Sequence, residues 1–98
     1  DSAAVRDPSS AAPVYPPALE TRGVAGHVIL RFVVDSTGVA DLTTVLTVEA
    51  THPAFDRAVR EALPKMKFRP AKVGDRAVRQ LAEQLFAFRV VEPNPSGT

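Results

Sequence analysis

The chain has 98 residues, of which 45% are hydrophobic, with no cysteine and a formal net charge of +1. This length fits one small domain, and the lack of cysteine excludes disulfides and thiolate metal sites. The weak net charge argues against nucleic acid as a partner. The sequence also contains no apolar run of about 20 residues, which is the length that a membrane-spanning helix needs.

Both ends of the chain are rich in small and polar residues. Residues 1–12 have the sequence DSAAVRDPSSAA, and residues 92–98 have EPNPSGT. Such segments bury too little apolar surface to offset the entropy lost on ordering. We therefore predict a flexible tether at 1–12, a folded domain at 13–91 and a disordered tail at 92–98.

The domain is predicted to begin with a short helix. Tyr15 is followed by Pro16 and Pro17, and proline suits the first turn of a helix, where its missing N–H is not needed. The sequence PALETRG then allows about two turns, with Leu19 facing inward and Gly23 ending the helix. A helix this short needs a larger structure to pack against.

A β-hairpin is predicted next. Residues 27–35 alternate, and their wholly apolar face consists of Val28, Leu30, Phe32 and Val34. The sequence DSTG at 35–38 is typical of a turn, with Gly38 free to take a positive φ. Residues 39–50 form the returning strand, and their less regular alternation predicts a β-bulge.

An amphipathic helix is predicted to follow the hairpin. Thr51 or His52 can cap it, Pro53 suits its first turn, and Pro64 should end it near Leu63. A pair between Arg57 and Glu61 is possible one turn apart. Apolar residues recur at helical spacing and form its buried stripe: Phe55, Val59, Ala62, Leu63 and Met66.

The last part of the domain is ambiguous from its residues alone. Residues 76–85 are good helix formers, whereas 86–91 alternate as a strand, so a helix before a short strand and one long strand both fit. Either version gives an α+β fold of two layers, in which the helical layer covers the apolar face of an antiparallel sheet.

No constellation of residues predicts catalysis or a cofactor. His27 and His52 lack the spacing of metal ligands, and Asp35 and Asp41 flank a turn, where carboxylates usually bond the local backbone. The aromatic residues near arginines are better used as core than for stacking bases: Phe68, Phe86 and Phe88. We expect no enzyme, no metal or other cofactor and no small-molecule substrate.

The last strand itself is the remaining candidate site. If it lies at the border of the sheet, its outer side offers unpaired N–H and C=O groups to a partner peptide. Charged side chains that could instead blunt this edge are Arg76, Arg79, Glu83 and Arg89.

Several motifs in order suggest a family. They are Tyr15-Pro16, Gly26 with HVILRFVVD, STG, an amphipathic helix, MKFRPA and FAFRV. This set resembles the C-terminal domain of TonB, the energy transducer of Gram-negative bacteria, over residues 13–91. The resemblance implies a three-stranded antiparallel sheet with both helices on one face, and it favours one long last strand at residues 77–90.

The resemblance also implies a function. The family's domain lies in the periplasm and binds the TonB box, a short peptide of outer-membrane β-barrel transporters, which adds as a strand to the domain's last strand. An N-terminal membrane helix and its partners ExbB and ExbD supply force from the proton gradient for uptake of siderophores or vitamins. The site residues implied are Arg79, Gln80, Leu81, Ala82, Glu83, Gln84, Leu85, Phe86 and Ala87 along the edge, with a hinge at Pro13, Val14, Tyr15 and Pro16. The alternative hypothesis is a structural domain that forms a homodimer through its last strand.

Overall fold

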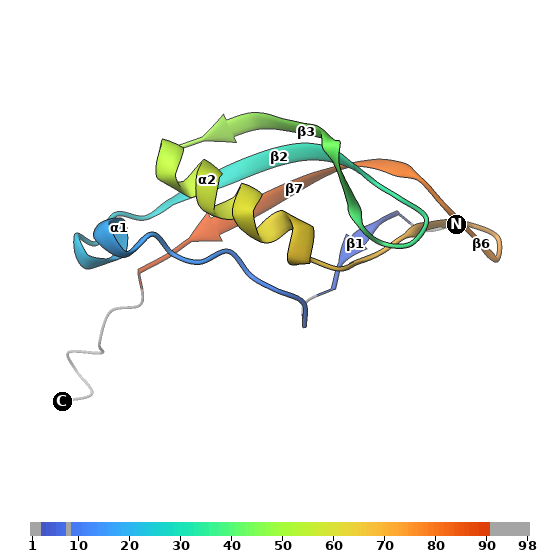
Figure 1. Ribbon diagram of the computed structural model, residues 1–98, viewed down its shortest axis with the longest axis horizontal. Helices are drawn as coiled ribbons and strands as arrows, with labels where there is room; N and C mark the ends of the chain where they lie inside the picture. The colour runs from blue at the N-terminus through green and yellow to red at the C-terminus, as the bar shows by residue number, and fades with distance from the viewer. Residues whose placement is uncertain (1–2, 8, 91–98) are drawn as a thin grey trace.

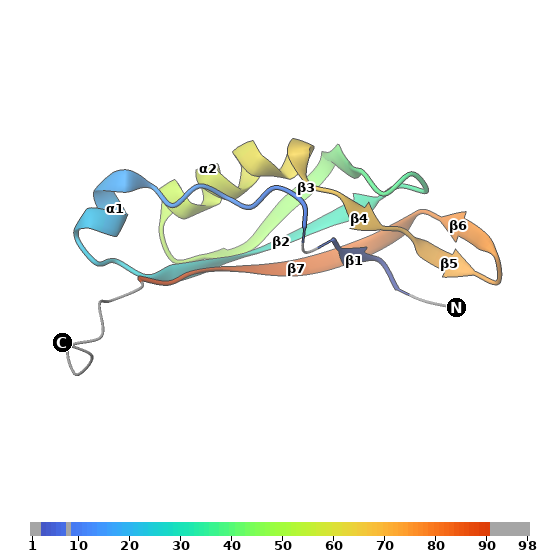
Figure 2. The ribbon, with the colours of Figure 1, turned by 90° about the horizontal axis from the view of Figure 1, so that it is seen from below.

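The computed structural model describes residues 3–7 and 9–90. Its central sheet is three-stranded and antiparallel, in the order β3-β2-β7. Figures 1 and 2 show α1 and α2 on the same face of this sheet, so the predicted α+β fold is confirmed. In chain order the elements are β1 (Val5–Arg6), α1 (Pro17–Thr21), β2 (Gly26–Val34), β3 (Ala40–Ala50), α2 (Pro53–Ala62), the 3₁₀ turn η1 (Leu63–Lys65), β4 (Phe68–Arg69), β5 (Ala71–Val73), β6 (Arg76–Val78) and β7 (Gln80–Phe88).

The core lies between α2 and the helix-facing side of the sheet. The predicted apolar face of β2 is fully buried, and so are Phe55 and Val59 on α2. Phe86 and Phe88 of β7 join them, and the rings of Phe55 and Phe88 stack with centroids 4.4 Å apart. Burial of each such side chain contributes about 1.5–3 kcal/mol. The sheet and α2 therefore depend on one shared core.

The predicted bulge in β3 is present. Pairing of β2 with β3 shifts between Ile29 and Leu30 and again between Arg31 and Val33. At the second shift, the N–H of Val33 donates to the Thr44 hydroxyl oxygen at 2.9 Å, which replaces a ladder hydrogen bond. The irregular alternation of β3 has this local cause.

Helix α2 begins and ends where the sequence predicts. The Nδ1 atom of His52 accepts a hydrogen bond from the N–H of Ala54 at 3.0 Å, and Pro53 occupies the first turn. The regular helix ends at Ala62, and Pro64 lies in the 3₁₀ turn. The ion pair along the helix joins Arg60 to Asp56 at 3.1 Å, in place of the pair suggested between Arg57 and Glu61.

The ambiguous C-terminal stretch is β-structure. A helix over 76–85 is wrong, because β7 pairs with β2 from Gln80 to Phe88 and needs both buried phenylalanines on the core side. The single long strand expected at 77–90 is interrupted at Arg79, and β7 ends at Phe88. Residues before the interruption form β6, which pairs with β5 in a separate hairpin.

Part of the segment predicted as a tether pairs with the domain. Strand β1 is antiparallel to β4, with Val5 opposite Arg69 and Arg6 opposite Phe68. The N–H of Asp7 donates to the carbonyl of Lys67 at 2.8 Å. These bonds pair main-chain groups on one side of β4. The tail predicted at 92–98 lies outside the described residues, among which no helix is long and apolar enough to span a bilayer.

Candidate binding edge on β7

Strand β7 forms one border of the central sheet. Its pairing with β2 runs from Gln80 opposite Val34 to Phe88 opposite Gly26. Within residues 3–7 and 9–90, no strand pairs with its other side. About half of the residues of such a strand direct their N–H and C=O groups to the outer side. A row of main-chain donors and acceptors is therefore available along this edge.

The predicted site residues alternate across the strand. Leu81, Glu83, Leu85 and Ala87 lie on the helix-free face and are exposed, whereas Ala82, Gln84 and Phe86 point to the helix side. Arg79 lies just before β7 and belongs to neither neighbouring strand. Because side chains stand off both faces, the outer edge itself presents mainly backbone.

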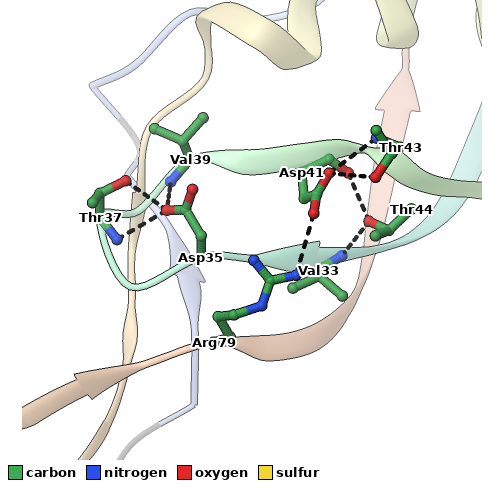
Figure 3. A network of polar contacts seen from close by, with 8 residues as sticks. All are labelled: Val33, Asp35, Thr37, Val39, Asp41, Thr43, Thr44 and Arg79. Carbon is green, nitrogen blue, oxygen red and sulfur yellow. Dashed lines mark hydrogen bonds and ion pairs between the residues drawn. The ribbon is translucent and has the colours of Figure 1, made fainter.

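The beginning of β7 is held by a polar network at the β2–β3 turn (Figure 3). The Arg79 guanidinium donates to the Asp41 carboxylate at 3.2 Å. The hydroxyl of Thr43 donates to the same carboxylate at 2.7 Å, and the Thr43 N–H does so at 3.1 Å. These hydrogen bonds, with that of Arg79, lower the pKa of Asp41 below 3.8.

A second carboxylate orders the turn itself. Asp35 accepts hydrogen bonds from the Thr37 hydroxyl at 2.6 Å and the Val39 N–H at 3.1 Å, and these lower its pKa. Gly38 adopts a φ of +86°, as predicted for this turn. Both turn aspartates thus act on local structure, in agreement with the interpretation from sequence.

The N-terminal segment forms the wall of a groove beside the edge. The groove has a volume of about 390 Å³ and is bounded by residues 85–89 on one side and by Arg6, Ala12, Pro13 and Tyr15 on the other. The Arg6 guanidinium lies 5.9 Å from the centre of the Phe86 ring, within the range of a cation–π contact. The groove therefore opens next to the main-chain groups of β7.

The predicted hinge residues lie at the end of this wall. The Tyr15 hydroxyl donates to the Val24 carbonyl, and its ring meets Phe55 and Phe88 edge-on, with centroids 5.8 and 5.5 Å away. Pro16 is the N-cap residue of α1, and Val14 is 74% exposed. Tyr15 thus fixes the chain to the core.

Sequence reasoning missed the contacts made before residue 12. Besides Arg6, the N–H of Ala4 donates to the side-chain oxygen of Gln80 at 2.8 Å. Strand β1 has only two residues, so no periodicity could have revealed it. His52 is the residue that caps α2, as one of the two caps predicted for this helix, and His27 contacts Glu49. The described residues contain no group of three or more possible metal-ligating His, Asp or Glu side chains.

Comparisons with known proteins assign the fold and the family. Residues 11–90 match the family "Gram-negative bacterial TonB protein C-terminal". Protein TonB of Pseudomonas aeruginosa is 36% identical over 78 residues, which cover 80% of this chain and 22% of that protein. The chain therefore spans about a fifth of the length of this relative.

Two solved structures are similar to this one. The solution NMR structure of the Pseudomonas aeruginosa TonB C-terminal domain has a TM-score of 0.74 at 30% identity, covering 96% of this chain and 93% of that one. The TonB2 protein of Vibrio anguillarum has a TM-score of 0.62 at 34% identity, covering 82% and 76%. The family match covers most of the chain, and the order of the sheet and its border strand agree with these structures. This chain therefore belongs to the TonB C-terminal domain family.

Proposed function

We propose that this periplasmic-type domain binds the TonB box of an outer-membrane transporter by strand addition to β7. The observation that supports the proposal is the unpaired outer side of β7 within the described chain. A peptide of about six residues extends roughly 20 Å and can form several main-chain hydrogen bonds along such an edge. Because these bonds require little of the side chains, one domain can serve several transporters.

The groove beside β7 adds a place for side chains of the guest. Residues of an added strand alternate between the two faces, and those on the helix side would enter the space between Phe86, Phe88 and Tyr15. Arg6 and Arg89 are the charged residues of the groove lining, and its other residues are alanine, proline, leucine and aromatic side chains. The proposal therefore combines a backbone ladder with a small apolar contact.

Force transmission is the second half of the proposal. The domain would receive a pull through its N-terminal segment from the inner-membrane complex with ExbB and ExbD and pass it to the bound transporter, so that a siderophore or vitamin can enter. The packing of Tyr15 against Phe55 and Phe88 supports this assignment, because it joins the N-terminal segment to the core beside β7.

Backbone-modified peptides test the binding mode. Peptides from the N-termini of transporters would be titrated into the labelled domain, with amide shifts measured by NMR. We expect shifts at residues 80–88, and we expect N-methylation of alternate peptide residues to abolish binding while methylation of the intervening residues is tolerated. Absence of shifts there with every peptide would contradict the proposal, as would a tight dimer through β7 that no peptide displaces.

A further inference from the structure

The helix-free face of the sheet carries an ordered pattern of side chains. Figure 2 shows α1 and α2 on one side of β2 and β7, with no described helix on the other. On that open face Ile29 lies opposite Leu85, and Val33 lies opposite Leu81. Between these two apolar pairs, Arg31 lies opposite Glu83 and donates to it at 2.9 Å.

This open face exposes several large apolar side chains to solvent. Leu81 is 62% exposed and Leu85 is 55% exposed. On the third strand Leu46, opposite Arg31, is 56% exposed. Three leucines that are each more than half exposed present on the order of 300 Å² of apolar surface. This area is comparable to the largest apolar patches on typical monomers, and such patches are often functional.

The charge pattern identifies the partner that fits. We propose that this open face binds the open face of a second copy of the chain. A wholly apolar partner would bury the ion pair of Arg31 and Glu83 without additional hydrogen-bonding groups, and a wholly charged one would leave the aliphatic pairs exposed. A second copy presents two aliphatic pairs separated by one cation and one anion, at the same spacing.

The pattern also selects one arrangement of the two copies. A two-fold axis parallel to the strands and midway between β2 and β7 places each β2 over the partner's β7. Arg31 then faces the partner's Glu83, and Ile29 and Val33 face the partner's leucines. An axis along β2 would place Arg31 over the partner's Arg31, where like charges repel.

The small contact area between the two open faces predicts a weak and reversible dimer. Strands β2 and β7 have nine residues each, so the overlap measures about 30 Å by 10 Å. A footprint of about 300 Å² per copy is well below the roughly 800 Å² of a standard interface. We therefore expect dissociation at low micromolar concentration and association towards millimolar concentration.

This arrangement leaves the outer edge of β7 free. If a guest strand adds there, as the proposed function states, the same axis places the partner's β3 over the guest, so the overlap grows to four strands. This further step rests on the proposed function. A bound peptide should then strengthen the dimer, whereas pairing between two β7 edges would compete with the peptide.

Charge exchange tests the inference. The variants Arg31→Glu and Glu83→Arg would each place like charges across the axis, whereas the double variant keeps both the internal pair and the pair across the axis. Sedimentation velocity between about 10 µM and about 1 mM spans the expected range for so small an interface. We expect the native chain and the double variant to associate, each single variant to associate at least about tenfold more weakly, and an equimolar mixture of the single variants to recover association.

The other outcomes overturn the inference. They are a native chain that stays monomeric near 1 mM, single variants that associate like the native chain, a mixture that does not recover, and a dimer that peptide displaces. Amide spectra of each variant confirm folding before the comparison. If no peptide binds in any arm, the proposed function fails, but the charge-exchange result still decides the dimer because it requires no peptide.

Discussion

Gly38 offers a stringent test of how the β2–β3 turn is joined to β4. Its φ of +86° is unfavourable for any residue with a Cβ, which costs about 1–2 kcal/mol. A Cβ built there would also lie 2.2 Å from the carbonyl oxygen of Phe68. The N–H of Phe68 donates to the Gly38 carbonyl at 2.9 Å, so moving Phe68 away weakens that bond, at a cost of about 1 kcal/mol.

The variant Gly38→Ala should therefore lose about 2–3 kcal/mol of unfolding free energy. Gly23 is the matched control, because its φ is +70° and an added Cβ would meet nothing within 4 Å. Gly23→Ala should lose only the conformational part, about 1–2 kcal/mol. In a domain of this size each kcal/mol lowers the melting temperature by about 4–8 °C.

Urea unfolding followed by circular dichroism would measure both variants, with thermal melting as a second determination. A larger loss for Gly38→Ala than for Gly23→Ala supports the contact with Phe68. An equal loss in the two variants would refute the reasoning, since it would show that the turn and β4 adjust freely around the added methyl group.

The remaining predictions concern the core, the hinge and the acid range. Phe32→Ala should lower the free energy of unfolding by about 3–5 kcal/mol, because Phe32 is fully buried. A loss of unfolding free energy no larger than that of a substitution at an exposed residue would contradict the placement of Phe32 in the core. Tyr15→Phe should lose about 1 kcal/mol with the hydrogen bond to Val24 while keeping its ring contacts, and an unchanged urea midpoint would contradict that role. Because the pKa of Asp41 is lowered from 3.8, its stabilising effect is present above that value and is lost as the pH falls through the lower folded pKa. The difference in stability between the native chain and Thr43→Val should thus shrink on acidification, and a constant difference would contradict this assignment.

The elements with strong periodicity could be predicted from sequence. The alternation of β2 and the helical spacing of α2 each encode which side is buried, and His52 with Pro53 marks where α2 begins. These signals are local, because each depends on residues close together in the chain.

The elements held by long-range contacts could not be predicted in the same way. Residues 80–85 have good helix propensity, but pairing with β2 and burial of the phenylalanines after them outweigh it. Strand β1 exists because β4, more than 60 residues later, offers it main-chain partners. The residues alone made the last strand a candidate site only on the condition that it lies at the border of the sheet, because an edge is a property of the whole sheet and leaves no pattern in its own residues. The resemblance to a family supplied the site residues that we propose on β7.

The short pairing of β1 with β4 has a mechanical consequence. A load applied at the N-terminal side acts on the hydrogen bond of Ala4 to Gln80 and on the two residue pairs of β1 with β4 before it acts on Tyr15. Each residue that is released from these contacts lengthens the chain by at most roughly 3.5 Å. Tyr15, half-buried with its ring against Phe55 and Phe88, is the point at which slack ends and tension reaches the sheet.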